Sequence, residues 1–269
     1  EGAAALLAGD VDERMSLAAV RTVAAARPGP AADGTDFEHA SLYRGSRAPP
    51  ESDYIARVRH PGVAASLDAR YIPRMATFDF FFDLGSPYSY LASTQLAGIE
   101  QRTGARARLV PVTLGGLRKA TGHQLPPPQQ LKYMSEDTAR WAKQYGVPMQ
   151  IPKVFPVNSI RALRACIAAD QQGKGAEAIH ALFRAYWADG NDISDAEAIE
   201  SALTAAGLDG KALVARTDAQ EVKDALRRNT DLALARGVFG VPTIFVGERS
   251  FWGNDRLHFV ETELRRVVG

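Results

Sequence analysis

The sequence predicts an α/β fold in which a strand–helix–strand unit precedes a long helical segment, a hairpin and a final helix. Residues 77–84 form an aromatic-rich apolar run that stops at a glycine, as a buried strand does. Ser86-Pro87 then supplies the capping hydroxyl and the first-turn proline of a helix that continues to Arg102. Residues 106–112 have the pattern of a second strand, so the three elements make a βαβ unit with a parallel strand pair.

Residues 115–236 are expected to be mainly helical, because their apolar residues recur at helical spacing between Gly or Pro breaks. The individual segments are residues 129–145, 159–172, 176–188, 195–206 and 219–236. Residues 241–246 and 249–252 have the pattern of a hairpin turning at Gly247-Glu248, and a last helix follows at about 255–267. The order β-α-β, helices, β-β-α is the thioredoxin plan with a helical domain inserted after the second strand. Fold alone does not give a function.

Residues 1–74 differ from the rest in composition, being rich in Ala, Arg, Pro and Gly with few large apolar side chains to bury. Only residues 11–26 have the periodicity of a helix, which breaks at Pro28. We expect residues 1–74 to be a largely disordered or non-native extension without chemistry, and residues 75–269 to form the enzyme domain. The alternative is a small regulatory or interaction segment.

The bulk composition is that of a globular protein, with 269 residues, 46% hydrophobic and 23% charged, and a net charge of +1. This charge gives no electrostatic case for nucleic acid or an anionic membrane surface. No apolar stretch approaches the ~18 residues of a membrane span, and the first residues lack the basic region of a signal peptide, so cytoplasm is expected. The single cysteine, Cys166, excludes an internal disulfide, a thiol pair and a cysteine-rich metal site; no metal is expected. It lies in an apolar helical run and is expected in the core.

The first chemical candidate is Ser86-Pro87-Tyr88-Ser89, at the strand-to-helix junction where a thioredoxin-like redox protein carries its two cysteines. A helix N-terminus offers unpaired N–H groups and partial positive charge, which stabilise a thiolate of the protein or of a ligand. A serine does not ionise easily, but its hydroxyl is a good donor to a bound sulfur. The hypothesis is that the reactive thiol belongs to a cofactor; the alternative is that Ser86 is only an N-cap.

Two further candidates lie near the end of the chain. Val241-Pro242 precedes a strand, where this fold carries a cis-proline whose preceding backbone groups can pair with an extended peptide ligand. A proline that simply heads a strand is the alternative. Asn254 and Asp255 begin the last helix, where they either cap it or hold the ammonium and carboxylate of an amino-acid end.

Four motifs in order give a specific resemblance over residues 78–266. They are Phe78-Asp79-Phe80 with Ser86-Pro87-Tyr88-Ser89-Tyr90-Leu91-Ala92, Phe155-Pro156-Val157-Asn158-Ser159, Gly237-Val238-Phe239-Gly240-Val241-Pro242-Thr243, and Phe251-Trp252-Gly253-Asn254-Asp255-Arg256. This series resembles the 2-hydroxychromene-2-carboxylate isomerases, which are similar to kappa-class glutathione transferases within the DsbA-like branch of the thioredoxin superfamily. Any one motif alone is a weak signal.

The resemblance implies a glutathione site. Ser86 would hydrogen-bond the glutathione sulfur, the Val241 backbone beside a cis-Pro242 would pair with the cysteinyl segment, and Asn254 and Asp255 would hold the γ-glutamyl end. It also implies glutathione-dependent isomerisation of 2-hydroxychromene-2-carboxylate-type aromatics to trans-o-hydroxybenzylidenepyruvate, in naphthalene-like catabolism, by a homodimer. A kappa-class-like transferase or peroxidase and a non-catalytic thioredoxin-like binding module are the alternatives. Serines at both cysteine positions argue against a dithiol oxidoreductase.

The sequence departs from the family pattern in the segment after the second strand. The family's asparagine position is His123 and its lysine position is Gln130, with Lys132 two residues further on. Either Lys132 takes over this anion contact or the contact is lost. His123, Lys132, Asn158 and Tyr88 are the candidate substrate-binding residues. The aromatic residues that either line a substrate pocket or pack in the core are Trp141, Tyr145 and Trp187.

Overall fold

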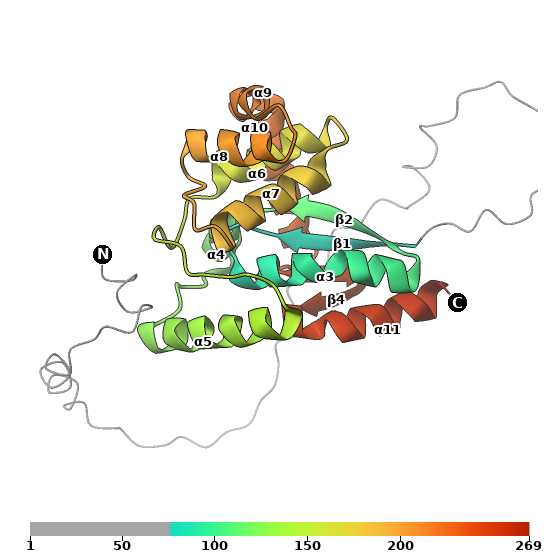
Figure 1. Ribbon diagram of the computed structural model, residues 1–269. Coiled ribbons are helices and arrows are strands. Elements are labelled where there is room, and N and C mark those ends of the chain that lie inside the picture. Colours follow the sequence, from blue (N-terminus) through green and yellow to red (C-terminus); the bar gives the residue numbers. More distant parts are fainter. Residues whose placement is uncertain (1–75, 269) are drawn as a thin grey trace, which may run out of the picture. The chain divides into compact units, whose positions relative to one another are not determined.

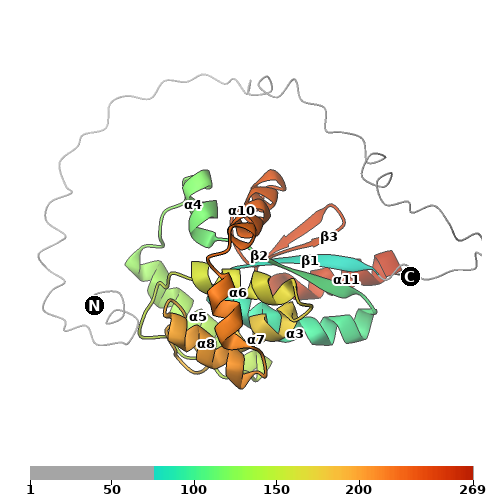
Figure 2. The ribbon, with the colours of Figure 1, turned by 90° about the horizontal axis from the view of Figure 1, so that it is seen from above.

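The computed structural model describes residues 76–268; the segment 1–74, with the helix expected at 11–26, lies outside the described residues. Within them the sheet has the strand order β2-β1-β3-β4 (Figure 1, Figure 2). Strand β1 (Thr77–Phe82) pairs in parallel with β2 (Arg106–Pro111) and antiparallel with β3 (Thr243–Val246). Strand β4 (Arg249–Trp252) pairs antiparallel with β3, which confirms the predicted hairpin.

Helix α3 (Pro87–Thr103) joins β1 to β2, so the predicted βαβ unit is present. The chain closes with a 3-10 turn, η2 (Asn254–Arg256), and helix α11 (Leu257–Val268). The last helix therefore begins later than the sequence indicates, because the 3-10 turn occupies its expected first residues. Helices α3 and α11 contact each other and lie below β1 and β2 in Figure 1.

A helical insertion separates β2 from β3, as predicted. Its helices are α4 (Leu114–Thr121), α5 (Pro128–Tyr145), α6 (Ile160–Asp170), α7 (Gly175–Trp187), α8 (Ala196–Ala205), α9 (Gly210–Arg216) and α10 (Gln220–Ala235). Helices α4 and α9 add to the individual predicted segments; each is too short for apolar periodicity to reveal it. Figure 1 shows α6 to α9 above the sheet and α5 below it, near α11.

Strand β1 is buried on both faces, and this fixes the place where the candidate site begins. Phe78, Phe80 and Phe82 point into the larger core shared with α3, α6 and α7. Phe81 points the other way and packs with Val110 and Phe245 in a second core. Because side chains alternate along a strand, the aromatic run fills two cores at once. The end of β1 that leads to Ser86 is therefore held from both sides.

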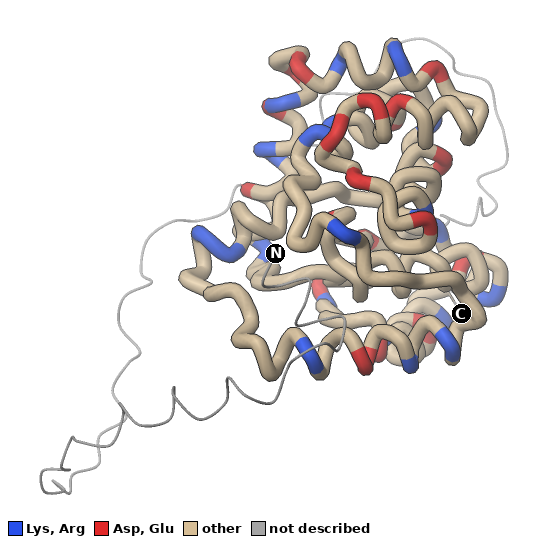
Figure 3. Tube along the Cα trace, turned by 60° about the vertical axis from the view of Figure 1, so that its left-hand side comes forward, with Lys and Arg blue, Asp and Glu red and all other residues tan. Residues whose placement is uncertain are grey.

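The described helices carry no membrane-crossing element: none within residues 76–268 is long and apolar enough to span a bilayer. Basic and acidic positions are intermixed along the helices in Figure 3, in keeping with the near-neutral net charge. Cys166 is fully buried in α6, which confirms the expected core position. Burial also raises the pKa of its thiol, so it is a poor nucleophile.

Candidate functional site

Ser86 caps helix α3 and also faces the strand that follows the insertion. Its Oγ accepts from the Ser89 N–H at 3.2 Å and donates to the Val241 carbonyl oxygen at 3.3 Å. The residue is buried, and its extended backbone (φ −97°, ψ 117°) is that of an N-cap. The capping interpretation is therefore correct. The same hydroxyl also lies beside Val241, as the functional interpretation requires.

The first turn of α3 leaves a donor free for an anion. Pro87 has no N–H, and the N–H groups of Ser89 and Tyr90 are bound by the side chain and the carbonyl of Ser86. Among residues 76–268, nothing accepts from the Tyr88 N–H. The Ser89 Oγ is likewise buried with no partner in the described part of the chain. Together with the positive end of the helix, the Ser86 hydroxyl and the Tyr88 N–H suit a negatively charged sulfur beside Ser86.

The Val241–Pro242 peptide bond is cis, as the sequence predicts. The turn before it is fixed by Thr243, whose Oγ1 donates to the Gly240 carbonyl at 2.7 Å. The Pro242 carbonyl accepts from the Gly253 N–H at 2.9 Å, which ties this turn to the start of η2. The cis-proline segment thus lies between Ser86 on one side and Asn254 on the other.

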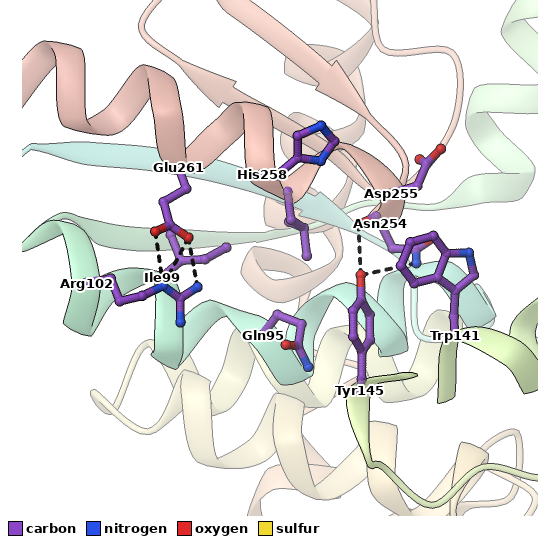
Figure 4. A pocket seen from close by; sticks show the side chains of 10 residues that line it. Gln95, Ile99, Arg102, Trp141, Tyr145, Asn254, Asp255, His258 and Glu261 are labelled. Carbon is purple, nitrogen blue, oxygen red and sulfur yellow. Dashed lines mark hydrogen bonds and ion pairs between the residues drawn. The ribbon is translucent and has the colours of Figure 1, made fainter. Parts of the chain in front are cut away.

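Asn254 and Asp255 line a pocket of about 240 Å³ between α3, α5 and α11 (Figure 4). Asn254 is buried, and its Nδ2 donates to Tyr145 Oη at 3.5 Å, while that hydroxyl donates to the Asn254 carbonyl at 3.1 Å. Asp255 is partly exposed and pairs with Arg256. The pocket residues are Gln95, Ile99, Arg102, Trp141, Tyr145, Asn254, Asp255, Leu257, His258 and Glu261.

The chemistry of this pocket is mixed. The Trp141 and Tyr145 rings lie 5.3 Å apart and form one wall from α5. Arg102 is paired with Glu261 at 2.8 Å, so its charge is already compensated. The Asp255 carboxylate and the Asn254 amide supply an acceptor for an ammonium group and a polar anchor beside it. Trp141 and Tyr145 are therefore pocket residues.

A cluster of aromatic rings, here called the ring cluster (His123, Phe239 and Trp252), adjoins the cis-proline turn. The Phe239 and Trp252 rings are 4.9 Å apart, and the His123 ring stacks on Phe239 at 6.3 Å. Phe239 is 44% exposed and Trp252 55% exposed. The Trp252 indole lies so close to Gly240 that a Cβ there would be 2.9 Å from its Nε1. The ring cluster is thus exposed but seated on backbone next to Val241.

The remaining predicted residues are more dispersed. The Tyr88 hydroxyl donates to Asp137 Oδ2 at 3.0 Å, which links α3 to α5, and burial raises its pKa. Lys132 is exposed on α5. Asn158 is exposed and accepts from the Ile160 N–H at 3.2 Å in a local turn. No hydrogen bond or ion pair within residues 76–268 joins Lys132 or Asn158 to Ser86.

Trp187 belongs to the core, not to the large pocket. It is fully buried, and its Nε1 donates to the Leu84 carbonyl at 2.8 Å. It also borders a cavity of about 20 Å³ beside Pro87 and Phe155, which is too small for an aromatic substrate. Of the three aromatic candidates, two therefore line the pocket and one packs in the core.

Sequence reasoning missed Phe239 and Trp252 as individual candidates, and it missed Asp83. The two rings were visible only as members of family motifs, with no periodicity or charge to mark them. Asp83 looked like an ordinary residue at the end of a strand, although it is only 4% exposed.

Comparison with known proteins shows the family of the chain. The model of the DsbA-like thioredoxin domain matches residues 77–265. A 2-hydroxychromene-2-carboxylate isomerase of Sphingobium xenophagum is 33% identical over 192 residues, which cover 70% of this chain and 97% of the relative. The rat glutathione S-transferase kappa 1 is 27% identical, covering 70% of this chain and 90% of the transferase.

A solved structure gives the same result. The structure of a 2-hydroxychromene-2-carboxylate isomerase superposes with a TM-score of 0.65 at 30% identity, covering 71% of this chain and 95% of that chain. The chain therefore belongs to the DsbA-like thioredoxin-domain family and, within it, to the 2-hydroxychromene-2-carboxylate isomerase family, a family of enzymes. The kappa-class transferases are more distant relatives.

Proposed function

We propose that this protein is a glutathione-dependent isomerase that converts 2-hydroxychromene-2-carboxylate-type aromatics into trans-o-hydroxybenzylidenepyruvate-type products. The observation that carries the proposal is the position of the Ser86 hydroxyl, at the positive end of α3 and 3.3 Å from the Val241 carbonyl. The relatives named as isomerases support the reaction, and the kappa-class relatives support the cofactor.

The residues of the chain fit glutathione by their donor chemistry. When bound, glutathione supplies a thiolate nucleophile, whose reversible addition to the substrate allows rotation about the former double bond. The Ser86 hydroxyl turns from Val241 to donate to the sulfur, and the free Tyr88 N–H adds a second donor. Both interactions favour the charged sulfur over the neutral thiol and so lower the pKa of the thiol.

The pocket beside Asn254 suits the γ-glutamyl end of the same ligand. The Asp255 carboxylate attracts the ammonium group, and the Asn254 amide is held in place by Tyr145. Val241 accepts from Ser86, and the next residue, Pro242, accepts from the Gly253 N–H beside Asn254, so Val241 is proposed to offer its backbone to the cysteinyl part of the peptide. One extended tripeptide thus has a partner for its sulfur, its middle and its end.

The aromatic half of the substrate has a matching surface in the ring cluster. Exposed rings attract another ring by apolar burial and by stacking, worth about 0.5–1.5 kcal/mol for each pair beyond area burial. The Trp252 indole lies against Gly240 and beside Phe239, and such contacts reduce the conformational entropy lost when the ring stacks on a ligand. Lys132 and His123 are proposed to attract the carboxylate, with Tyr88 and Asn158 as further substrate contacts.

The decisive experiment measures isomerisation with and without glutathione, together with the glutathione remaining at the end. The proposal expects a rate that depends on glutathione and no net consumption. Equal rates without glutathione contradict it. Consumption of one glutathione per product favours the second candidate, a kappa-class-like transferase, which the 27% identity to the rat enzyme makes the nearest alternative.

The cellular setting is also part of the proposal. We expect a cytoplasmic homodimer acting in the catabolism of naphthalene-like aromatics, on the basis of the family resemblance. Size-exclusion chromatography with light scattering tests the dimer, and growth of a deletion strain on naphthalene tests the pathway. A monomer or unimpaired growth contradicts the respective part.

A further inference from the structure

Asp83 is a buried carboxylate, and the proposed chemistry assigns it no role. It is 4% exposed and lies in the turn between β1 and α3. Its Oδ1 accepts from the Gly85 N–H at 2.8 Å and from the Ser159 hydroxyl at 2.6 Å. Its Oδ2 accepts from the Leu114 N–H at 2.7 Å. Its own carbonyl accepts from the Ser86 N–H at 3.0 Å, so the residue holds the Ser86 turn through both backbone and side chain.

These partners belong to three different helix starts. Leu114 is the first residue of α4, and Ser159 is the N-cap residue of α6. Neither Thr113 at the start of α4 nor Ser159 makes a capping bond of its own with a side chain within the described residues. The Ser159 hydroxyl instead donates a hydrogen bond to Asp83 Oδ1. One carboxylate therefore anchors the starts of α4 and α6 to the turn that precedes α3.

Burial of the Asp83 carboxylate in its charged form costs free energy. Burial raises the pKa of Asp83, and the three hydrogen bonds and the Arg118 charge only partly oppose it. Each of its three partners donates, so the geometry is made for the ionised carboxylate. Burying the ionised Asp83 carboxylate lowers the free energy of unfolding, yet the same carboxylate joins the Ser86 turn to the helical insertion. Its contribution is therefore sought in the geometry of the site and not in stability.

We propose that Asp83 is a positioning residue of the site: it holds the Gly85 turn and the starts of α4 and α6 so that the Ser86 hydroxyl meets the Val241 carbonyl. The catalytic consequence rests on the proposed function, because it requires Ser86 to act on the glutathione sulfur. The structural consequence does not, since the Ser86 contact exists in the free protein.

A ligand-free experiment tests the structural part. Asp83→Asn places an NH₂ group among three donors, so at least one of them loses its acceptor. Amide hydrogen exchange of the unliganded protein should become about tenfold faster at Gly85, Ser89 and Leu114 in this variant. The matched control is Asp79→Asn on β1, which loses its pairing with Arg108 and Arg236 but touches none of these amides. Equal exchange in the two variants overturns the proposal.

A double-mutant cycle tests the catalytic part. Asp83→Asn should lower kcat about tenfold in the natural background and change it little in a Ser86→Ala background, because a positioning residue acts through Ser86. Equal losses in both backgrounds indicate a general structural role and overturn the proposal. Ser159→Ala, which removes one donor without changing charge, should give a smaller effect of the same pattern. If the natural protein has no isomerase activity, the proposed function fails while the exchange experiment still decides the positioning role.

Discussion

The Ser86 hydroxyl and the Val241 carbonyl oxygen lie 3.3 Å apart, although 155 residues separate them in the sequence. This contact joins the cap of α3 to the cis-proline turn that follows the helical insertion in the sequence. It also occupies the two groups that are proposed to receive the glutathione sulfur and backbone. Ligand binding is therefore expected to exchange one internal hydrogen bond for contacts with the tripeptide.

Replacing Ser86 by Ala removes a helix cap and the donor to sulfur together. We expect a free energy of unfolding lower by about 1 kcal/mol, a higher pKa for bound glutathione and a kcat reduced at least about tenfold. Asp195→Ala is the matched control, because Asp195 caps α8 through the Ala198 N–H and lies outside the site. Denaturant unfolding and thiolate absorbance separate the two effects. If Asp195→Ala raises the pKa of bound glutathione as much as Ser86→Ala does, the role of Ser86 as the donor to the sulfur is contradicted.

Replacing Ser86 by Cys should create a reactive thiol at the same position. The helix N-terminus and the free Tyr88 N–H stabilise its thiolate, so its pKa should fall below the ordinary value for cysteine. Cys166 serves as the internal reference, since burial raises its pKa and covers its sulfur. Titration of thiolate absorbance with pH should show one thiol per folded variant chain that ionises below the ordinary cysteine range, and no such thiol in the natural protein. A Ser86→Cys thiol that ionises at or above the ordinary cysteine pKa would contradict the prediction.

Truncating Trp252 to Ala should weaken binding of the aromatic substrate but not of glutathione. Losing one stacking partner should raise KM for the substrate by about threefold to tenfold at saturating glutathione. Phe259→Ala is the control, because Phe259 is similarly exposed (50%) but lies on α11, outside the ring cluster. Steady-state kinetics with both ligands provide the measurement. The substrate does not stack on the ring cluster if the two variants behave alike.

Tyr145→Phe removes the hydroxyl that holds Asn254 through two hydrogen bonds. Because Asn254 is proposed to anchor the γ-glutamyl end, the Kd for glutathione should rise about threefold to tenfold. Tyr186→Phe is a suitable comparison, since it deletes a tyrosine hydrogen bond to the Val154 carbonyl within the insertion. Isothermal titration calorimetry should show weaker binding only for Tyr145→Phe. Unchanged affinity would place the γ-glutamyl end elsewhere.

The raised pKa of Asp83 predicts a specific pH dependence of stability. The folded protein keeps a proton on Asp83 at pH values where the unfolded chain, with a pKa of about 4, has lost it. The proton retained on Asp83 raises the free energy of unfolding. This contribution is complete below the pKa of Asp83 in the unfolded chain and is lost as the pH rises through its pKa in the folded protein. Asp83→Asn removes it, so the natural protein minus the variant should show a stability difference that falls as pH rises above about 4. A difference that is flat with pH, measured by urea unfolding, contradicts the prediction.

Most secondary structure was predictable because its signals are local. The aromatic run of β1, the Ser86-Pro87 start of α3 and the glycine-centred hairpin turn each depend on a few adjacent residues. Helix α4 was missed as a separate element for a physical reason. The group that accepts from its first N–H is the carboxylate of Asp83, 31 residues earlier, and the adjacent Thr113 makes no side-chain capping bond, so the actual cap could not be read from neighbouring residues.

By itself, the sequence determined the thioredoxin-like order of elements, the serine in place of a cysteine at the head of α3 and the proline that proves to be cis. The tertiary structure alone decided which residues meet: Ser86 with Val241, Asn254 with Tyr145, Phe239 with His123 on one side and Trp252 on another, and Asp83 with Ser159. Propensity and capping act over one or two helical turns, whereas these contacts depend on the path of the whole chain around two cores.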